Sequence, residues 1–273
     1  MEFLGVKIDG VTKEQALQKV AGFLSGGLPG EALAKTGHKI FTPNPEFVVK
    51  AQKDEYFKKV LNSGDLNLCD GMGLQIFTGI KRVPGVDFML EICRLASEQG
   101  RAVYLLGSGS DEVVKKTAEK LQIQFPNLKL VGHDKGPMID ELRIRSKALQ
   151  LRRASNEENI FSSLLTPSNC ELSADCIAKI NAIRPDILFV AFGMGKQEKW
   201  IYENLAKMPS VKIAMGVGGS FDFISGKVKR APLFLRRLGL EWVYRLVQEP
   251  RRIGRIFNAT AKFCYLALKE KIL

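Results

Sequence analysis

The chain has 273 residues, 45% of them hydrophobic, and a formal net charge of +12. This length suits one large α/β domain with at most a small appendage, and a core of this size needs no disulfide bonds. The five cysteines are scattered and form no CxxC pair, which argues against a disulfide framework and a structural zinc site. There is no signal peptide and no apolar run of about 18 residues, so we expect neither export nor a membrane-spanning helix.

The positive charge is concentrated at the C-terminal end of the chain. Residues 226–273 hold twelve Lys and Arg against three Glu, a net charge of +9, whereas the preceding 225 residues carry only +3. A nearly balanced body with a basic tail indicates an anionic partner for the tail.

Strand and helix patterns alternate along most of the chain. Thr12 and Gln15 form a capping box that predicts a helix to about Leu24. Strands are predicted at residues 39–42, 66–69, 102–106, 128–131, 186–191 and 212–216. Further helices are predicted at residues 46–61, 74–80, 86–99, 111–124 (with Asp111 as the cap) and 196–207. This alternation predicts a Rossmann-like α/β fold, with a mainly parallel sheet and helices on both faces.

Two segments depart from this alternation. Residues 138–172 are charged and then polar, and we interpret them as an insertion whose role the sequence leaves open. From about residue 227 the chain is helical in pattern, basic and rich in aromatic residues. We therefore expect a Rossmann-like domain over residues 1–226, insertion included, followed by a helical, basic appendage over residues 227–273.

Polar or glycine-rich segments follow five of the predicted strands. Ligands of parallel α/β sheets bind beyond the carboxyl ends of the strands, which meet at one edge of the sheet. The sequence therefore predicts a ligand site built from these segments, which are residues 42–44, 70, 107–110, 192–195 and 216–220.

Two of these segments carry side chains suited to a sugar substrate. Asp70 lies at a strand end beside two glycines, where a ligand can approach closely. Its carboxylate either acts as a general base for a substrate hydroxyl or caps the next helix, and the residues alone leave both roles open. Flanking prolines hold Thr42 and Asn44 in fixed positions for hydrogen bonds to a polyol; the alternative is a turn in which Asn44 caps a helix.

Three glycine-rich loops offer contacts for a nucleotide sugar. Free backbone N–H groups after a strand favour a phosphate, although the loop at 107–110 matches neither GxGxxG nor a Walker motif. Gln197 is suited to a uracil edge or a phosphate, and Asp222 either caps a turn or contacts a ribose. Several such loops at one sheet edge favour a nucleotide-sugar site. The candidate residues are Gly107, Ser108, Gly109, Gly195, Gln197, Gly218, Gly219 and Asp222.

Nothing in the sequence indicates a metal site. His38 and His133 show no ligand spacing, and no DxD motif supplies a carboxylate pair that would hold a metal against a diphosphate. No Ser-His-Asp arrangement or nucleophile elbow is visible. We therefore expect no metal and no cofactor besides the donor substrate.

The motifs, in their order along the chain, resemble the WecG/TagA/CpsF family of bacterial glycosyltransferases, which act in cell-envelope polysaccharide synthesis. They are TPNPEFVV, DGMG, RVPGVD, LLGSG, GMGKQEKW, MGVGGSFDFISG, RAP and LGLEW with YRL and EPRR after it. The resemblance covers about residues 1–137 and 174–260. One departure is Gly195, where the family often has proline, which concerns the stiffness of the loop more than its chemistry.

The resemblance implies a UDP-sugar-dependent hexosyltransferase. Family members transfer a sugar, often N-acetylmannosamine or its uronic acid, from UDP to a lipid-linked acceptor, typically undecaprenyl-diphospho-N-acetylglucosamine. Transfer inverts the anomeric carbon and is not known to need a metal. A glucose donor for an exopolysaccharide stays open, as does self-association into a homo-oligomer. The implied location is cytoplasmic, peripheral on the inner face of the plasma membrane.

The resemblance also assigns roles to residues. Asp70 matches the proposed catalytic base, Thr42 and Asn44 match pocket residues, and Gln197 matches the polar residue of GxxKQE. The leaving diphosphate needs positive charge, for which we expect Arg82 and arginines of the appendage. The appendage arginines, also expected near the acceptor diphosphate and the membrane, are Arg230, Arg237, Arg245 and Arg252.

The appendage is expected to dock on the membrane surface. Apolar and aromatic residues interleaved with Arg and Lys are typical of helices that lie in a membrane interface. The alternative is an ordinary amphipathic helix that packs on the body. The residues expected to face lipid are Phe234, Leu235, Leu238, Leu240, Trp242, Tyr244, Phe257, Phe263 and Tyr265.

Three other classes of protein were weighed. A nucleic-acid-binding protein would explain the basic tail, but no RNA-recognition, helix-turn-helix or zinc pattern is present, so we expect no nucleic-acid partner. A Rossmann dehydrogenase is disfavoured because GxGxxG and its downstream acidic residue are missing. A non-catalytic sugar-nucleotide sensor is disfavoured because Asp70 and the TPNPE segment are intact.

Overall fold

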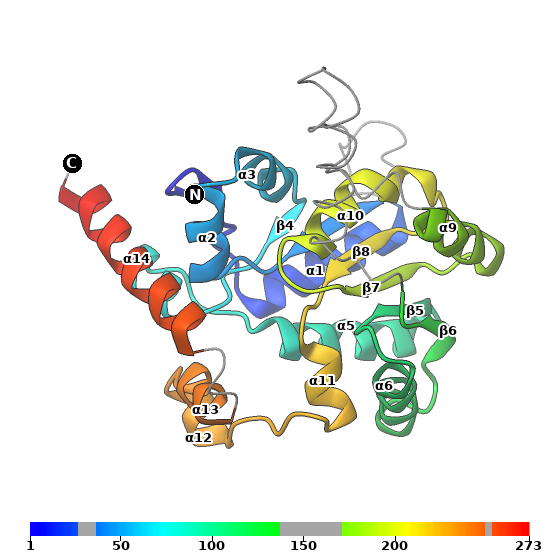
Figure 1. The fold of residues 1–273 in the computed structure, drawn as a ribbon. Coiled ribbons are helices and arrows are strands. Elements are labelled where there is room, and N and C mark those ends of the chain that lie inside the picture. Colours follow the sequence, from blue (N-terminus) through cyan, green and yellow to red (C-terminus); the bar gives the residue numbers. More distant parts are fainter. Residues whose placement is uncertain (27–36, 137–170, 249–252, 273) are drawn as a thin grey trace, which may run out of the picture.

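A computed structural model of the chain describes residues 1–26, 37–136, 171–248 and 253–272. Its centre is a six-stranded sheet with the order β4-β3-β8-β7-β5-β6, in which every neighbouring pair of strands is parallel (Figure 1). The strands are β3 (His38–Phe41), β4 (Leu66–Asn67), β5 (Ala102–Gly107), β6 (Lys129–Asp134), β7 (Ile187–Ala191) and β8 (Ile213–Gly216). A separate antiparallel pair, β1 (Glu2–Phe3) and β2 (Val6–Lys7), was not predicted.

Helices connect the strands and cover the sheet. Those of the body are α1 (Lys13–Ser25), α2 (Pro45–Ala51), α3 (Glu55–Asn62), α4 (Met72–Thr78), α5 (Gly85–Gln99), α6 (Asp111–Gln124), α9 (Glu171–Ile183), α10 (Lys196–Asn204) with the 3-10 helix η2 (Leu205–Lys207), and α11 (Ser220–Ser225). The basic C-terminal segment forms α12 (Leu233–Arg237), α13 (Glu241–Gln248) and α14 (Ile253–Ile272).

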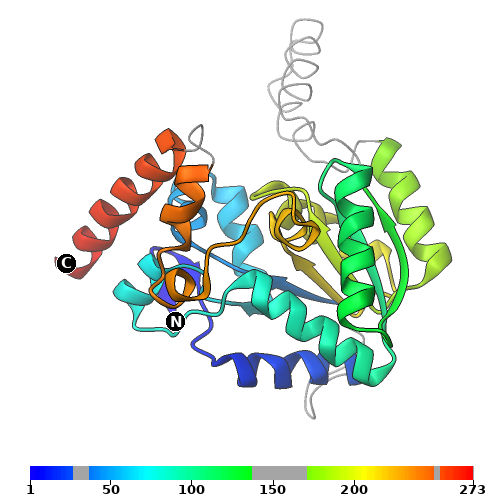
Figure 2. The same cartoon turned by 90° about the horizontal axis from the view of Figure 1, so that it is seen from below.

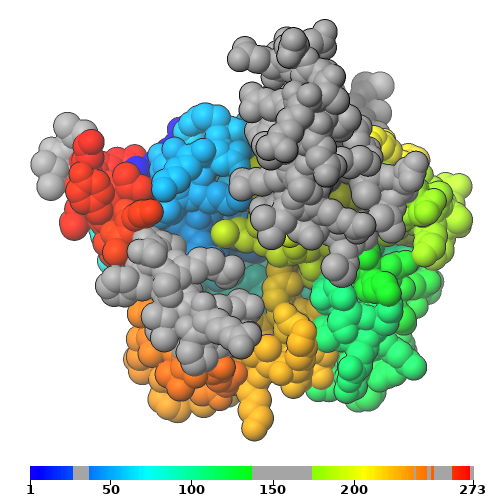
Figure 3. Space-filling view, viewed as in Figure 1, coloured from blue at the N-terminus to red at the C-terminus, as the bar shows by residue number. Residues whose placement is uncertain are grey.

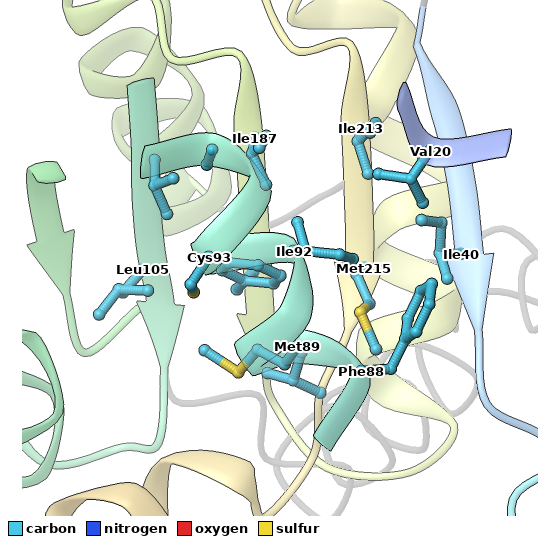
Figure 4. Packing of buried hydrophobic residues seen from close by; sticks show 14 of the residues in the cluster. Val20, Ile40, Phe88, Met89, Ile92, Cys93, Leu105, Ile187, Ile213 and Met215 are labelled. Atoms are coloured by element: carbon cyan, nitrogen blue, oxygen red, sulfur yellow. The ribbon is translucent and has the colours of Figure 1, made fainter. Parts of the chain in front are cut away.

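Alternation along the strands builds one apolar layer on each face of the sheet. Ile187 and Phe189 of β7 pack in a cluster with residues of α1, α5 and α6, whereas Leu188 and Val190 pack in a second cluster with residues of α2, α3 and α10. Figure 4 shows the first cluster, with Ile92 of α5 set against the strands, and Figure 2 looks onto the same face. Strands buried on both faces are typical of parallel α/β folds, so the predicted Rossmann-like architecture is confirmed.

Several local boundaries and helix caps differ from the prediction. The capping box at Thr12 is confirmed, but the predicted helix at 46–61 is two helices, because Asp54 accepts a hydrogen bond from Phe57 N and starts α3. Helix α6 is capped by Ser110, whose hydroxyl accepts from Val113 N, so the assignment of Asp111 as the cap was wrong. Helix α11 was not predicted. The proposed insertion at 138–172 lies outside the described residues, except for its last two, which begin α9.

The C-terminal helices gather at the end of the molecule where β4 lies, away from α6 and α9 (Figure 1). Helix α14 packs on α2 and α4, and Phe263 is 1% exposed against Phe3 and Phe77. The expectation that Phe263 faces lipid was therefore wrong, because the body of the protein covers it. No helix within the described ranges is both long enough and apolar enough to cross a bilayer.

Candidate active site

The loops after β3 and β4 lie side by side because their strands are neighbours in the sheet. The backbone N–H of Asp70 donates to the carbonyl oxygen of Pro43 at 2.8 Å. A Cβ atom added to Gly73 would lie only 2.9 Å from Cγ of Pro45, so the glycine allows this close contact. The two motifs TPNPE and DGMG therefore form one continuous wall at the carboxyl edge of the sheet.

Gly85, at the start of α5, brings the two candidate side chains together. A Cβ atom at Gly85 would lie 3.3 Å from Oγ1 of Thr42 and 3.4 Å from Oδ2 of Asp70. The N–H of Gly85 donates to Oδ2 of Asp70 at 3.2 Å. The prediction did not include Gly85 in the site, although it lies in the RVPGVD motif.

Asp70 has the electrostatic environment of a base that works near neutral pH. Burial raises the pKa of its carboxyl to about 6, and the negative charges of Glu241 and Asp87 also raise it. The Gly85 hydrogen bond and the positive charge of Arg82 act in the opposite direction. Asp70 does not cap α4, whose N-terminal position is Gly71 without a side-chain cap. The helix-cap alternative for Asp70 is therefore not found at α4, although Oδ2 accepts from Gly85 N at the start of α5. The carboxylate keeps further lone pairs for a substrate hydroxyl.

Asn44 has a structural role in addition to any contact with substrate. Its side-chain oxygen accepts from Phe47 N at 3.2 Å and so caps α2, as the alternative interpretation held. The cap fixes the direction in which the TPNPE loop leaves β3, and with it the place of Thr42, which is 9% exposed.

Helices α12 and α13 form a second wall beside Asp70. The guanidinium of Arg82 donates to the carbonyl oxygen of Arg236 at 2.8 Å. A Cβ atom on Gly239, between α12 and α13, would overlap the side chain of Met72. Nε of Arg236 is buried and has no hydrogen-bond partner in the described part of the chain. The charge of Arg82 thus acts on the base, whereas Nη1 of Arg236 pairs with Oδ1 of Asp87 at 3.8 Å. Arg236 was missed because the sequence showed it only as one of many basic residues.

Arg230 is held by two carboxylates. Its terminal nitrogens bind Asp87 of α5 at 2.6 and 3.0 Å, and its Nε donates to Glu241 of α13 at 3.1 Å. This arrangement joins the basic segment to the body of the protein and neutralises the charge of Arg230. Of the other predicted arginines, Arg237 ends α12 and Arg245 lies in α13, whereas Arg252 falls outside the described residues.

The loop after β5 is tightly constrained. Gly107 has a φ of +121°, and a Cβ atom there would lie 2.7 Å from the backbone of Ala191. Ser108 also has a positive φ, 75°, and its N–H donates to the oxygen of Ala191 at 2.9 Å. The N–H of Gly109 donates to the oxygen of Lys135 at 3.4 Å. Two of the N–H groups expected to cradle a phosphate are therefore already bonded within the protein.

The loops after β7 and β8 meet through buried polar side chains. Gln197 is 2% exposed and hydrogen-bonds both Glu198 and the N–H of Gly218, which follows β8 with Gly219. Glu198 is fully buried, and burial raises its pKa to about 7, against the effect of its hydrogen bonds and of Lys50. The prediction missed Glu198, although its three-residue spacing from Gly195 is that of a capping box.

Asp222 lies in α11, and its carboxylate pairs with Lys227 at 3.3 Å. The described residues contain no group of three or more His, Cys, Asp or Glu that could hold a metal ion. The candidate site therefore consists of Asp70, whose pKa is raised, the nearby guanidinium of Arg82 and a row of glycine loops along one sheet edge.

Comparisons with known proteins bear on this arrangement. The whole chain, residues 1–273, matches the family model described as "Glycosyl transferase WecG/TagA/CpsF family". It is 32% identical over 243 residues to the N-acetylglucosaminyldiphosphoundecaprenol N-acetyl-beta-D-mannosaminyltransferase of Bacillus subtilis strain 168, with 87% of this chain and 81% of that protein covered. It is 27% identical over 278 aligned residues to a protein of the same name from Staphylococcus aureus strain MW2, with 99% and 93% covered.

Proposed function

The chain belongs to the WecG/TagA/CpsF family of glycosyl transferases, and from this we propose that it moves N-acetylmannosamine, or a close relative, from a UDP-sugar to an undecaprenyl-diphosphate-linked N-acetylglucosamine. The observation that carries the proposal is Asp70, a carboxylate with a pKa raised to about 6, beside Thr42 and Gly85 at the sheet edge. The names of the two relatives described above support this donor sugar and this acceptor.

In the proposed reaction, a hydroxyl oxygen of the acceptor attacks the anomeric carbon of the donor. The new C–O bond forms as the bond to UDP breaks, and the carboxylate of Asp70 takes the hydroxyl proton. One base and one displacement invert the anomeric carbon. Negative charge that develops on the leaving diphosphate is balanced by Arg82, whose positive charge also acts on Asp70.

The sheet order supports a place for each substrate. The acceptor sugar lies over β4 and β3, between Asp70 and the α12–α13 wall. The donor nucleotide lies over the glycine loops of β8 and β7, the next strands along the edge. In the proposed arrangement the anomeric carbon of the donor lies near the boundary between β3 and β8, between the two substrates.

A direct assay tests this proposal. The purified protein is incubated with a panel of UDP-sugars and a short-chain lipid-diphospho-N-acetylglucosamine, and UDP release is followed. We expect release that requires the acceptor and that favours UDP-N-acetylmannosamine over UDP-N-acetylmannosaminuronic acid and UDP-glucose. Release that is the same without acceptor would indicate hydrolysis, and absence of UDP binding by calorimetry would contradict the proposed donor.

We also propose that the protein works peripherally at the cytoplasmic face of the membrane, since its acceptor is a lipid. Helices α12 and α13 expose large apolar side chains beside the site, among them Leu233 (61% exposed), Leu238 (62%) and Trp242 (47%). Figure 3 shows the orange surface of these helices at the same end of the molecule as red α14. Apolar groups flanked by arginines suit the interface of an anionic bilayer.

Replacing Leu238 by glutamate is expected to weaken binding to vesicles that contain anionic lipid by about tenfold or more. The substitution removes apolar area that the bilayer buries on binding, and it places a negative charge against anionic lipid headgroups. Flotation measures the bound fraction. Ile123→Glu, at an even more exposed apolar residue (79%) on α6, is the matched control and is expected to leave binding unchanged. Equal losses in both variants would argue against α12–α13 as the docking surface.

A further inference from the structure

Two adjacent side chains at the start of α10 tie together the loops after β7 and β8. The N–H of Gly195 donates to Oε2 of Glu198 at 2.6 Å, and Nε2 of Gln197 donates to Oε1 of Glu198 at 2.6 Å. Oε1 of Gln197 accepts from the N–H of Gly218 at 2.9 Å. We name Gln197 and Glu198 the relay pair, because hydrogen bonds run through both from one loop to the other.

The relay pair is sealed inside the protein. Gln197 is 2% exposed and Glu198 is fully buried. A Cβ atom on Gly216 would lie 2.9 Å from Nε2 of Gln197 and 3.0 Å from Oε1 of Glu198, so the pair packs against the end of β8. Neither side chain is placed to reach a ligand directly, and what each contributes must act through the loops it holds.

The two ends of the relay determine how many donors and acceptors the two side chains must supply. Both ends are backbone N–H groups, of Gly195 and Gly218, so each relay side chain must present an oxygen to its end. At the junction between the side chains, one must then donate and the other accept. A carboxylate next to an amide meets this condition, whereas two amides place two NH₂ groups face to face and two carboxylates place two charges face to face.

Two glycines of the joined loops leave space where another residue would have a side chain. Apart from its chain neighbours, no atom of the described residues lies within 4 Å of a Cβ position at Gly193, and at Gly218 the atoms within that distance are the amide atoms of Gln197 at 3.9 Å. Both glycines have positive φ, 84° and 51°, so their backbone can come close to a ligand where a side chain would intervene.

We propose that Gln197 and Glu198 are positioning residues that fix the glycine loops at 193–195 and 217–219 relative to each other, so that the backbone of both loops binds the donor nucleotide. This rests on the proposed function, since the ligand of these loops is taken to be the UDP moiety. Gln197 then acts through Gly218 and does not read the uracil itself.

Exchange of the two side chains gives a sharp test. Glu198→Gln keeps the bond to Gly195, as glutamine also serves in a capping box, but brings two NH₂ groups together at the junction. Gln197→Glu replaces the amide donor by a second buried carboxyl group, so at about pH 8 the pair must either repel as two anions or take up a proton that the unmodified protein does not need. The double variant Gln197→Glu with Glu198→Gln restores every hydrogen bond in the reverse order, at the same net charge.

We expect each single variant to weaken UDP binding, measured by calorimetry, by about tenfold or more, because a buried donor or charge loses its partner. The KM for the donor should rise in parallel while the KM for the acceptor stays unchanged. The double variant should return the UDP affinity to within about threefold of the unmodified protein. Glu203→Gln is the matched control and should leave UDP binding unchanged. Glu203 is a half-buried carboxylate of the same helix, and it accepts a hydrogen bond from the hydroxyl of Tyr56 rather than from the loops.

Single variants that bind UDP normally, or a double variant as weak as the single ones, would overturn the relay. Should the unmodified protein bind no UDP, the proposed donor is wrong, and the relay is judged by amide hydrogen exchange at the two loops. Faster exchange in both single variants, with recovery in the double variant, would support the relay under that outcome. Equal exchange in all forms would overturn it.

Discussion

Replacing Asp70 by asparagine is expected to lower the turnover number by about 10²–10⁴-fold, the range over which a positioned base contributes to catalysis. The asparagine oxygen can still accept the hydrogen bond that Gly85 donates to Asp70, so the loops should keep their places. What the variant loses is the ability to take a proton from the acceptor hydroxyl. Initial rates of UDP release at about pH 8 measure the effect.

The stability of the Asp70→Asn variant provides an independent check. The folded pKa of Asp70, about 6, lies above its unfolded value of 3.8, so the stability linked to this group is complete below about pH 3.8 and is lost as the pH rises to about 6. Above that window the asparagine variant should melt at the same temperature as the unmodified protein or higher. Asp134→Asn, at the end of β6 on the same sheet edge, is the control that should retain turnover. Turnover close to that of the unmodified protein would remove Asp70 from the role of base.

The positions of the strand ends could be predicted from the sequence because each buried strand is a short apolar run closed by glycine or a polar residue. A parallel sheet then brings these ends to one edge whatever the order of its strands. Asp70 and Thr42 are 28 positions apart in the sequence, yet both follow such strands, and the structure places both next to Gly85. Composition did not reveal the strand order, which depends on crossovers between distant elements.

Several partners of charged and polar groups were not predicted, although local helix caps were. Arg230 was expected to meet a diphosphate, but Asp87, 143 positions earlier, takes two of its nitrogens. Gln197 was expected to face a ligand, but its side chain is buried and donates a hydrogen bond to its neighbour Glu198. Hydropathy patterns report which residues are buried and carry no information about which opposite charges meet.

The basic C-terminal segment shows a related limit. Its aromatic residues have the spacing of a membrane-facing helix and equally of a helix packed on a body. Phe263 packs on the body, whereas Phe234 is 62% exposed. Which aromatic residues pack on the body depends on the apolar surfaces that α2 and α4 offer to α14, and these surfaces form only in the folded chain.

The ion pairs of Arg230 lead to the second large prediction. Arg230→Met is expected to lower turnover by about 10–100-fold, because removing the cation of a partly buried ion-pair cluster leaves the carboxylates of that cluster with less positive charge. Here Glu241 loses this partner and Asp87 keeps Nη1 of Arg236 at 3.8 Å, and both carboxylates raise the pKa of Asp70. Without the guanidinium, α13 loses this link to α5, while α14 and the Arg82–Arg236 contact still hold the appendage on the body.

A pH profile separates this electrostatic role from a general loss of structure. The acidic limb of kcat/KM should lie near pH 6 in the unmodified protein, since Asp70 must be ionised to accept a proton. Arg230→Met should move that limb to higher pH, because Asp87 and Glu241 then act on Asp70 with less positive charge beside them, Arg236 at 3.8 Å from Asp87 being retained. Asp87→Asn should move it to lower pH, because it removes one of the charges that raise the pKa of Asp70.

The double variant Arg230→Met with Asp87→Asn shows whether Arg230 acts by neutralising Asp87 or by binding the acceptor diphosphate. If Arg230 serves mainly to neutralise Asp87, removing both should recover part of the turnover lost in Arg230→Met and return the acidic limb toward pH 6. Additive losses with an unmoved limb would instead mean that Arg230 contacts the acceptor diphosphate itself, because a phosphate ligand is not replaced by deleting Asp87. The two contacts cannot be made at once by a guanidinium that already binds two carboxylates, so binding of the acceptor would then have to open the link between α5 and α13.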